Sequence, residues 1–415
     1  MLDDKTKKIQ IVIVGNGFGG VYTLKNLYKL FKGNKRVQIS LIGEKNYFLF
    51  SPLLHEVATG GINPENIVEP IRKVLGHCIS NFYLGKAEEI DLESRVVKVG
   101  ENVLPYDYLV LASGSETNFY NISGAKENSL TLKSIEDAIK IKNRIINQVE
   151  KASHEKDREK RKKMLTFIVV GGGPTGVELV AEIQELIQES FSKYYKKELI
   201  NDASVILIQK DKEILPQFGK KIREKSLKFL IKKGIKVMLN TEVKEITKHF
   251  VLLGSNEKIE TENIIYVAGI KPRELNFNKD ILKTKDGRII VNEYLQLEEY
   301  KEVYALGDLA AFKIKNTDTT LPALAQVAEK EAHRVAENIY LSINDKKVKT
   351  FVYKSSGSLL SLGRWMAIGE IWNFTFSGHF IWWLWRTVYL SKLISFRKKL
   401  KVALDWTINI FSPRD

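Results

Sequence analysis

Apolar residues gather in short runs along the chain, and two of these runs lead directly into glycine-rich segments. Residues 9–14 precede Gly15–Gly20, and residues 166–170 precede Gly171–Gly176. Beyond each glycine segment the apolar positions recur at helical spacing, which predicts one helix from about Gly19 to Phe31 and another from Pro174 to about Tyr195. The pattern therefore predicts two strand–turn–helix units that are well separated along the chain.

The same pattern predicts further strands and helices after each unit. The expected strands are residues 37–42, 104–115, 204–209, 235–239 and 302–306, with short strands through 242–291; the expected helices are 134–152, 219–233 and 323–341. Alternation of strands with helices is typical of an α/β fold built on parallel sheets.

Both glycine segments match G-x-G-x-x-G, the fingerprint of a dinucleotide site. The first glycine permits a tight turn, the second lets the backbone approach a pyrophosphate, and the third lets the helix pack closely on the strand. The N-terminus of the helix then faces the phosphate charge. Two such sites suggest that electrons pass from one dinucleotide to the other, as in a flavoprotein that is reduced by a nicotinamide.

Small and acidic residues follow other strands of the first unit. Glu44 lies roughly 20 residues beyond the first glycines, the spacing at which a carboxylate binds the ribose hydroxyls of an adenosine. Ala112, Ser113 and Gly114 end another strand, and their size lets the backbone pass close to a cofactor.

A late strand that ends in Gly307-Asp308 suggests that the first nucleotide domain is completed near the end of the chain. We therefore expect two Rossmann-like domains, the second inserted in the first. The predicted limits are 1–118 with 293–345 for the first domain, 119–292 for the second, and 346–415 for an amphipathic helical tail.

Composition narrows the chemistry. The 415 residues suffice for two or three domains, and their 44% apolar content can form a large core. The single cysteine, Cys78, excludes an intramolecular disulfide and a CxxC pair, and the six histidines show no metal-ligand spacing, so no metal is expected. Residues 1–8 are polar, so neither a secretory signal nor a transit peptide is expected.

The net charge of +15 indicates more about function by its distribution along the sequence than by its size. The run from Glu150 to Lys163 mixes both signs and is typical of a solvated helix and loop. Residues 376–415 carry seven basic and two acidic side chains, a balance of +5, among many aromatics. This combination indicates a membrane surface and no nucleic acid.

The tail also holds all six tryptophans, from Trp365 onward. Residues 380–396 are nearly all apolar, but they are fewer than the ~20 that a spanning helix needs, and they include Arg386 and Lys392. Beyond them Leu400, Leu404, Ile408 and Phe411 share one helical face, which predicts an interfacial anchor. A dimer interface, or a helix packed on the rest of the chain, is the alternative.

These features together resemble the type II NADH:quinone oxidoreductases, also called alternative NADH dehydrogenases. The resemblance spans nearly the whole chain, and its more specific parts are the proline-leucine segment, the alanine-glutamine segment and the tail. The matching stretches are Gly15–Gly20, Phe50–Ala58, Tyr106–Ser115, Gly171–Leu179, Gly307–Ala310 and Pro322–Ala328, with Gly363 and Gly369 in the tail.

The resemblance implies a respiratory electron-transport enzyme with non-covalent FAD in the first domain and NADH or NADPH in the second. Hydride would pass from the nicotinamide to the flavin, and two electrons with two protons would pass to a membrane quinone, menaquinone or ubiquinone, without proton pumping. The lack of a targeting segment suggests a peripheral protein on the cytoplasmic face of a bacterial inner membrane. The resemblance also implies a possible homodimer.

Residue roles follow from the same resemblance. Gln326 would lie beside the flavin ring where quinone docks, and Glu178 near nicotinamide and flavin; these two are the catalytic candidates. Asp308 would bond the ribityl or phosphate part of FAD. The cofactor-binding candidates are Gly15, Gly17, Phe18, Gly19, Gly20, Glu44, Ala112, Gly114 and Asp308 for FAD, and Gly171, Gly173, Pro174, Thr175, Gly176, Gln209 and Gly269 for the nicotinamide dinucleotide.

Two positions depart from the family pattern. The quinone motif Ala-Gln-x-Ala-x-Gln ends in Lys330 in this chain, where a cation could alter quinone contacts or pair with a local acid. The strand after the second fingerprint ends in Gln209-Lys210, where NADH-selective members place an acid. Without that carboxylate a 2′-phosphate is not repelled, and Lys210 could attract it, so NADPH use is a hypothesis for this chain.

Three other functions share parts of this pattern. A sulfide:quinone oxidoreductase needs redox-active cysteines near the flavin, and the lone Cys78 argues against it. A reductase of a soluble acceptor does not need the tryptophan-rich basic tail. A non-enzymatic nucleotide sensor is compatible with both fingerprints and would be distinguished by the absence of turnover.

Overall fold

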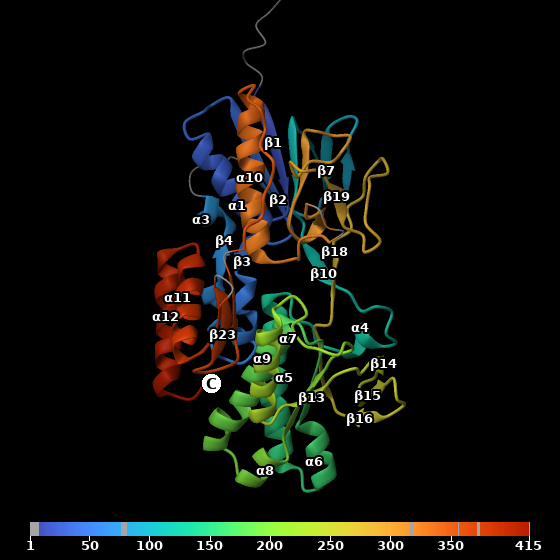
Figure 1. Ribbon diagram of the computed structural model, residues 1–415, viewed down its shortest axis with the longest axis vertical. Coiled ribbons are helices and arrows are strands. Elements are labelled where there is room, and N and C mark those ends of the chain that lie inside the picture. The colour runs from blue at the N-terminus through green and yellow to red at the C-terminus, as the bar shows by residue number, and fades with distance from the viewer. Residues whose placement is uncertain are drawn as a thin grey trace, which may run out of the picture. The chain divides into compact units, whose positions relative to one another are not determined.

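The computed structural model describes residues 8–75, 81–315, 317, 319–355, 357–371 and 374–414. Cys78 lies outside these residues. The chain forms two compact units (Figure 1). The first unit comprises residues 1–49, 68–116 and 270–354, and the second comprises 50–67, 117–269 and 355–415.

The first unit is built on a five-stranded sheet in the order β20-β9-β1-β2-β5. Its strands are β1 (Ile9–Val14), β2 (Val37–Gly43), β5 (Asn81–Leu84), β9 (Tyr108–Leu111) and β20 (Val303–Ala305). All four pairings are parallel, and the late strand β20 pairs with β9, so the end of this unit does complete the first sheet as predicted. Helices α1 (Phe18–Leu30) and α10 (Ala325–Ile343) lie side by side against it (Figure 1).

Short elements surround this sheet. They are β3 (Tyr47–Leu49) paired with β4 (Val68–Pro70), the antiparallel β6 (Glu89–Asp91), β7 (Val96–Val99) and β8 (Asn102–Pro105), β19 (Ile289–Val291) paired with β21 (Ala310–Phe312), and α3 (Ile71–Leu75). The chain leaves the unit through β10 (Ser115–Thr117) and re-enters it through β18 (Ile270–Pro272).

The second unit contains a parallel four-stranded sheet in the order β13-β12-β11-β17. Its strands are β11 (Thr166–Val170), β12 (Ser204–Ile208), β13 (Lys236–Met238) and β17 (Asn263–Tyr266), flanked by α5 (Ile135–His154), α7 (Pro174–Glu185) and α9 (Lys220–Lys232). Smaller elements are α2 (Leu54–Val57), α4 (Ala125–Asn128), α6 (Arg158–Met164), α8 (Lys197–Asn201) and the antiparallel β14 (Val243–Ile246), β15 (Phe250–Leu253) and β16 (Lys258–Glu260).

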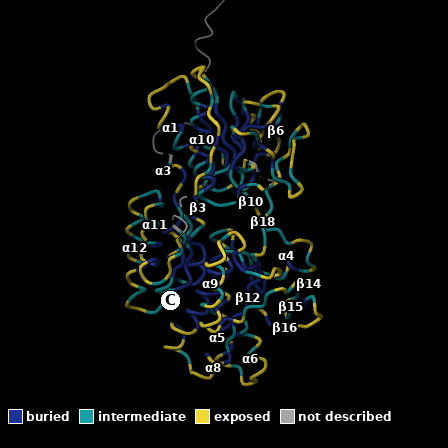
Figure 2. Tube along the Cα trace, in the orientation of Figure 1, coloured by how far each residue is buried: buried dark blue, intermediate teal, exposed yellow. Residues whose placement is uncertain are grey.

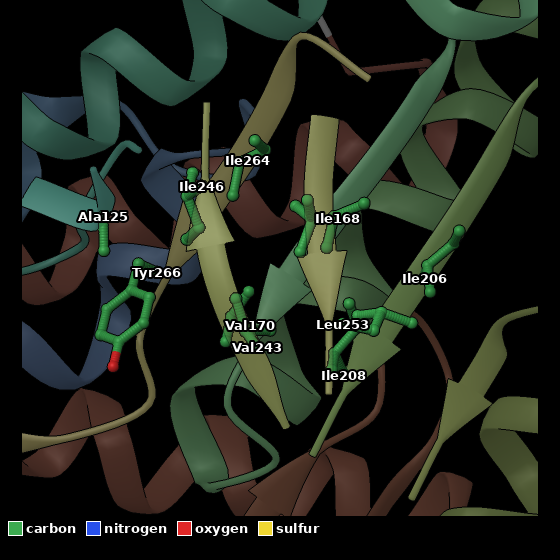
Figure 3. Packing of buried hydrophobic residues seen from close by; sticks show 11 residues of the cluster. Ala125, Ile168, Val170, Ile206, Ile208, Val243, Ile246, Leu253, Ile264 and Tyr266 are labelled. Carbon is green, nitrogen blue, oxygen red and sulfur yellow. The ribbon is translucent and has the colours of Figure 1, made fainter. Parts of the chain in front are cut away.

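One buried cluster ties this sheet to the antiparallel strands. Ile168, Ile206 and Tyr266 of the parallel sheet pack with Val243 and Leu253, all nearly inaccessible to water (Figure 3). Near-continuous burial along β11 and β12 is expected because both faces of a parallel sheet are covered.

The tail belongs to the second unit and contains more than helices. An antiparallel sheet of β22 (Ser358–Ser361), β23 (Ala367–Ile371) and β24 (Phe374–Gly378) precedes α11 (His379–Lys392) and α12 (Phe396–Phe411). The sequence pattern predicts the helices but not this sheet. Within the described ranges, no helix has both the length and the apolarity needed to cross a membrane.

The limits of the units differ from the predicted domain limits at several places. Residues 346–354 group with the first unit and 355–415 with the second, so the tail is not a separate unit. Residues 270–292 group with the first unit, because β19 pairs with β21 there. Residues 50–67 group with the second unit, because α12 holds them: Trp406 donates to Glu56 at 2.9 Å and Asn409 to the Gly61 carbonyl at 2.7 Å.

Candidate functional site

The first fingerprint makes the turn that its glycines predict. Gly15 has φ +108°, and a Cβ there would lie 2.1 Å from the Ala112 carbonyl oxygen. A Cβ on Gly20 would lie 1.7 Å from the Gly15 oxygen, so neither position admits a side chain. By contrast, a Cβ on Gly17, the residue that caps α1, would meet no neighbouring atom within 4 Å. The space beside the helix N-terminus is therefore open to a ligand.

The second fingerprint repeats this geometry. Gly171 has φ +115° and lies against Ala268, and a Cβ on Gly176 would be 1.9 Å from the Gly171 oxygen. Gly173 caps α7 and would meet no protein atom within 4 Å. Pro174 and Thr175 form the first turn of α7, which carries no acidic residue. Each unit thus contains one cradle whose middle glycine faces open space.

The ends of the first sheet converge beside Gly15. A Cβ on Gly19 would meet the Leu306 side chain at 2.6 Å and the Ala112 Cβ at 3.1 Å, so β1, β9 and β20 end together. Gly114 has φ +73° and open space beside it. The Ser113 hydroxyl is buried without a hydrogen-bond partner in the described part of the chain. Phe18 begins α1 and stacks edge-on against Phe48, with ring centroids 5.1 Å apart.

Asp308 lies at this edge, in a turn braced by a residue that the sequence analysis did not single out. The Asp308 carboxylate accepts from the Ser115 hydroxyl at 2.5 Å, and Glu331 accepts the Gly307 N–H at 2.7 Å. Burial raises the pKa of Glu331 to about 8, with a smaller contribution from the negative charge of Asp308. Its place on the buried face of α10 is the signal that could have found it.

Glu44 follows β2 as predicted and is paired with a second residue that the sequence analysis missed. Its carboxylate accepts from the Arg273 guanidinium at 2.8 Å, and both side chains are about half exposed. The backbone N–H of Arg273 donates to the Gly114 carbonyl at 3.0 Å. Arg273 therefore connects the ribose candidate to the glycine that follows β9.

The two residues of the quinone motif differ in their surroundings. Gln326 lies half-buried in the first turn of α10. Lys330, one turn further on, has its ammonium 5.2 Å from the centre of the Tyr353 ring and donates to the Lys354 carbonyl. The cation at the final motif position is thus held by the segment that follows α10.

Glu178 is buried on α7 in the second unit. It accepts the Ser361 N–H at 3.2 Å, and its other oxygen lies 3.7 Å from His55 Nδ1. Burial raises the pKa of Glu178 well above its ordinary value and lowers the pKa of His55 to about 3. Both groups therefore favour their neutral forms, and their contact is not an ion pair.

More buried charge lies around this pair than the sequence analysis predicted. Arg414 donates to Glu182 and, at 2.9 Å, to Glu185, and all three side chains are less than a tenth exposed. Arg386 lies over the Trp382 ring, 3.5 Å from its centre. Burial and the neighbouring Glu182 raise the pKa of Glu56. The spacing of these residues along the chain gave no signal, because they come from three distant segments.

Gln209 contacts the second fingerprint directly. Its amide oxygen accepts the Gly172 N–H at 2.7 Å, and its amide nitrogen donates to Asp211 at 2.8 Å. Lys210 is ion-paired with Glu242 at 2.7 Å. Gly269 lies shortly after strand β17 of the same sheet, and a Cβ there would lie 2.5 Å from the Tyr120 hydroxyl. No group of metal-ligating residues occurs among the residues that the structure describes.

Two family models match this chain, one over the nucleotide-binding region and one over the tail. Residues 9–332 match the family model for pyridine nucleotide-disulphide oxidoreductases, and residues 355–415 match the NDH2 C-terminal domain. The chain is 31% identical to a probable NADH dehydrogenase of Dictyostelium discoideum, covering 98% of this chain and 90% of that one. It is also 31% identical to the type II NADH:quinone oxidoreductase Ndh of Mycobacterium tuberculosis, over 98% and 89% of the two chains.

Among solved structures, NDH2 of Plasmodium falciparum in complex with NADH superposes with a TM-score of 0.89 at 24% identity. The match covers 99% of each chain. At that identity the superposition establishes the shared fold.

Proposed function

The chain belongs to the type II NADH:quinone oxidoreductases, and we propose that it works as one through the two cradles described above. It oxidises NADH and reduces a quinone. The first unit binds FAD without a covalent bond, and the second binds the nicotinamide dinucleotide. When bound, the flavin would supply the redox chemistry, taking hydride from the nicotinamide and passing two electrons, with two protons, to the quinone.

The observation that carries this proposal is the repeated cradle. Gly17 and Gly173 each face open space at a helix N-terminus, where a pyrophosphate is stabilised by backbone N–H groups. The unpartnered Ser113 hydroxyl at the edge of the first cradle fits a polar ligand there. Glu44 would accept hydrogen bonds from the adenosine ribose hydroxyls of FAD, with Arg273 holding its carboxylate in place. Asp308 would bond the ribityl or phosphate part of FAD.

For Glu178 we propose a proton-holding role beside the reacting groups. A carboxyl that is neutral, buried and hydrogen-bonded to Ser361 can give up a proton when quinone is reduced. Glu178→Gln keeps the shape and the acceptor for Ser361 but cannot titrate. We expect the half-reaction with quinone to slow at least about tenfold while flavin reduction by NADH changes little. If both half-reactions of Glu178→Gln keep the rates of the native chain, this role is contradicted.

Gln326 is proposed to contact the quinone, since it lies half-buried in the first turn of α10. Lys330 is proposed to hold the segment at Tyr353 and Lys354 instead of contacting quinone, because its ammonium is engaged there.

Association with a membrane surface is proposed for the tail. On α12 the polar face is turned inward: Asp405 accepts from the Asn63 N–H at 3.0 Å and from the Asn66 amide at 2.6 Å. Figure 2 shows exposed positions along α12. Four apolar side chains of its outer face, Leu400, Leu404, Ile408 and Phe411, are between 51% and 83% accessible. An exposed apolar face flanked by basic residues suits the boundary of a lipid bilayer. The cytoplasmic side, a bacterial source and a homodimer stay predictions.

Replacing the middle glycine of each cradle separates the two binding functions. Alanine at Gly17 or Gly173 adds a methyl group that meets no protein atom, so the fold should tolerate it. Gly17→Ala should weaken FAD retention at least about tenfold, because the methyl group occupies the approach of the pyrophosphate. Gly173→Ala should keep FAD but slow anaerobic flavin bleaching by NADH to a similar degree. Gly254→Ala, with an ordinary contact of 3.6 Å to Glu242, is the control.

The same preparations test the whole reaction. Flavin bleaching by NADH, followed by recovery of the yellow colour on adding a menaquinone or ubiquinone analogue, is the expected result for the native chain. Bleaching without recovery would indicate a reductase of a soluble acceptor. Failure of NADH to bleach the flavin would overturn the proposed activity.

A further inference from the structure

The loop after β12 carries a carboxylate that the second fingerprint holds in place. Gln209 is buried, and both ends of its amide are used: the oxygen accepts the Gly172 N–H and the nitrogen donates to Asp211. Gly172 lies inside the fingerprint itself. Asp211, unlike Gln209, is exposed to solvent and available to a ligand.

The neighbouring cation is balanced by a second acid. Lys210 and Glu242 form an ion pair at 2.7 Å, with side chains 73% and 55% exposed. The pairing raises the pKa of Lys210 and lowers that of Glu242, so both stay charged. With Asp211, the three side chains carry one positive and two negative charges. Lys210 therefore does not present an uncompensated positive charge to a phosphate.

We propose that Asp211, positioned by Gln209 and supported by Glu242, selects NADH against NADPH. The inference rests on the proposed function, in which the second fingerprint binds the nicotinamide dinucleotide. In this fold the strand that follows the fingerprint helix ends at the adenosine ribose, where a carboxylate accepts the 2′-hydroxyl and repels a 2′-phosphate. Position 209 lacks an acid, and Asp211, two residues later, takes its place. Gln209 holds the Asp211 carboxylate by donating a hydrogen bond to it.

Charge removal at this loop gives a direct test. Flavin reduction in the holoenzyme would be followed with NADH and with NADPH, and equilibrium binding of NAD⁺ and NADP⁺ would be measured by calorimetry. We expect the native chain to favour NADH. Asp211→Asn should shift the NADPH-to-NADH ratio of kcat/KM at least about tenfold toward NADPH, because a close repulsive charge is lost. The same shift should appear in the binding ratio of the oxidised nucleotides.

A second variant changes the charge at the same loop and leaves Gln209 and Asp211 in place. Glu242→Gln releases Lys210 and should also raise the ratio toward NADPH, and added salt should reduce the discrimination of the native chain. Glu260→Gln is the charge-matched control, since Glu260 pairs with Lys163 in the same unit. Its ratio should equal that of the native chain.

The outcomes separate the two proposals. A native chain that uses NADPH as well as NADH, or an unchanged ratio in both Asp211→Asn and Glu242→Gln, would overturn the selectivity inference alone. A native chain that binds neither NAD⁺ nor NADP⁺ and is reduced by neither NADH nor NADPH would overturn the proposed function, and the inference with it.

Discussion

Glu331 is a buried carboxyl whose titration should be visible in stability. It accepts the Gly307 N–H and lies 2% exposed behind the Gly307–Asp308 turn. Its folded pKa of about 8 is above the ordinary 4.5. A raised pKa contributes stability that is fully present below pH 4.5 and is lost as the pH rises through 8, because the folded chain then resists ionisation.

Glu331→Gln removes this titration and keeps an oxygen for Gly307. Relative to the variant, the native chain should lose stability between pH 4.5 and 8, by at most about 5 kcal/mol. Denaturation midpoints followed by circular dichroism across this range measure the difference. Glu337→Gln on the same helix is a control of opposite sign. Lys349 and Arg334 lower the pKa of Glu337, so its ionised carboxylate contributes stability at pH values above the pKa of the unfolded chain. Parallel pH profiles for the native chain and Glu331→Gln would contradict the account.

The sequence predicts the role of a residue where that role depends on its immediate neighbours along the chain. Gly20 admits no side chain because the turn closes on the Gly15 oxygen within six positions, which is a property of the local pattern. Arg273, Glu56 and Arg414 find their partners far along the chain. Long-range pairing of this kind depends on the folded topology, so spacing alone could not identify it.

Elements show the same division between local and distant causes. The helix over 134–152 was predictable and is observed as α5, whose Ser134 and Asp137 form a reciprocal N-terminal cap. The helix expected from Pro174 to about Tyr195 is observed as α7 to Glu185, and it continues as a π-helix over Leu186–Ser190 and a 3₁₀ turn over Phe191–Lys193. The β22–β24 sheet was missed because its strands are only four or five residues long and rich in glycine and polar residues.

The attachment of the tail explains why α7 is so heavily buried. Glu182 and Glu185 lie on this helix with almost no exposure, and two carboxylates in that setting need a cation. Arg414 supplies it for both, and Lys233 adds a contact to Glu185 at 3.0 Å. The fingerprint helix and the tail are therefore joined by charge as well as by packing, within one compact unit.

For the molecule as a whole, charge and apolar exposure suggest one mode of membrane contact. The net charge of +15 would attract the chain to anionic lipid, at about 1 kcal/mol for each basic residue near the surface. Charge alone does not fix an orientation, because lysines and arginines occur throughout the sequence. The exposed face of α12 would fix one, since its exposed apolar residues lie on one side of a helix whose other side packs inward and is hydrogen-bonded to residues 61–66.

Removing apolar area from that face should therefore weaken membrane binding without loosening the tail. Leu404 and Ile408 are 59% and 58% exposed, so the double variant Leu404→Gln/Ile408→Gln changes little of the folded interior. Binding to vesicles of mixed neutral and anionic lipid, measured by co-sedimentation, should fall at least about tenfold, because each side chain loses roughly 1 kcal/mol of apolar burial. Leu282→Gln removes a comparable exposed leucine, 62% accessible, from the first unit and should bind as the native chain does. If the double variant still sediments with vesicles while high salt releases both proteins alike, electrostatic attraction would account for binding, and the α12 face would be available to a protein partner instead.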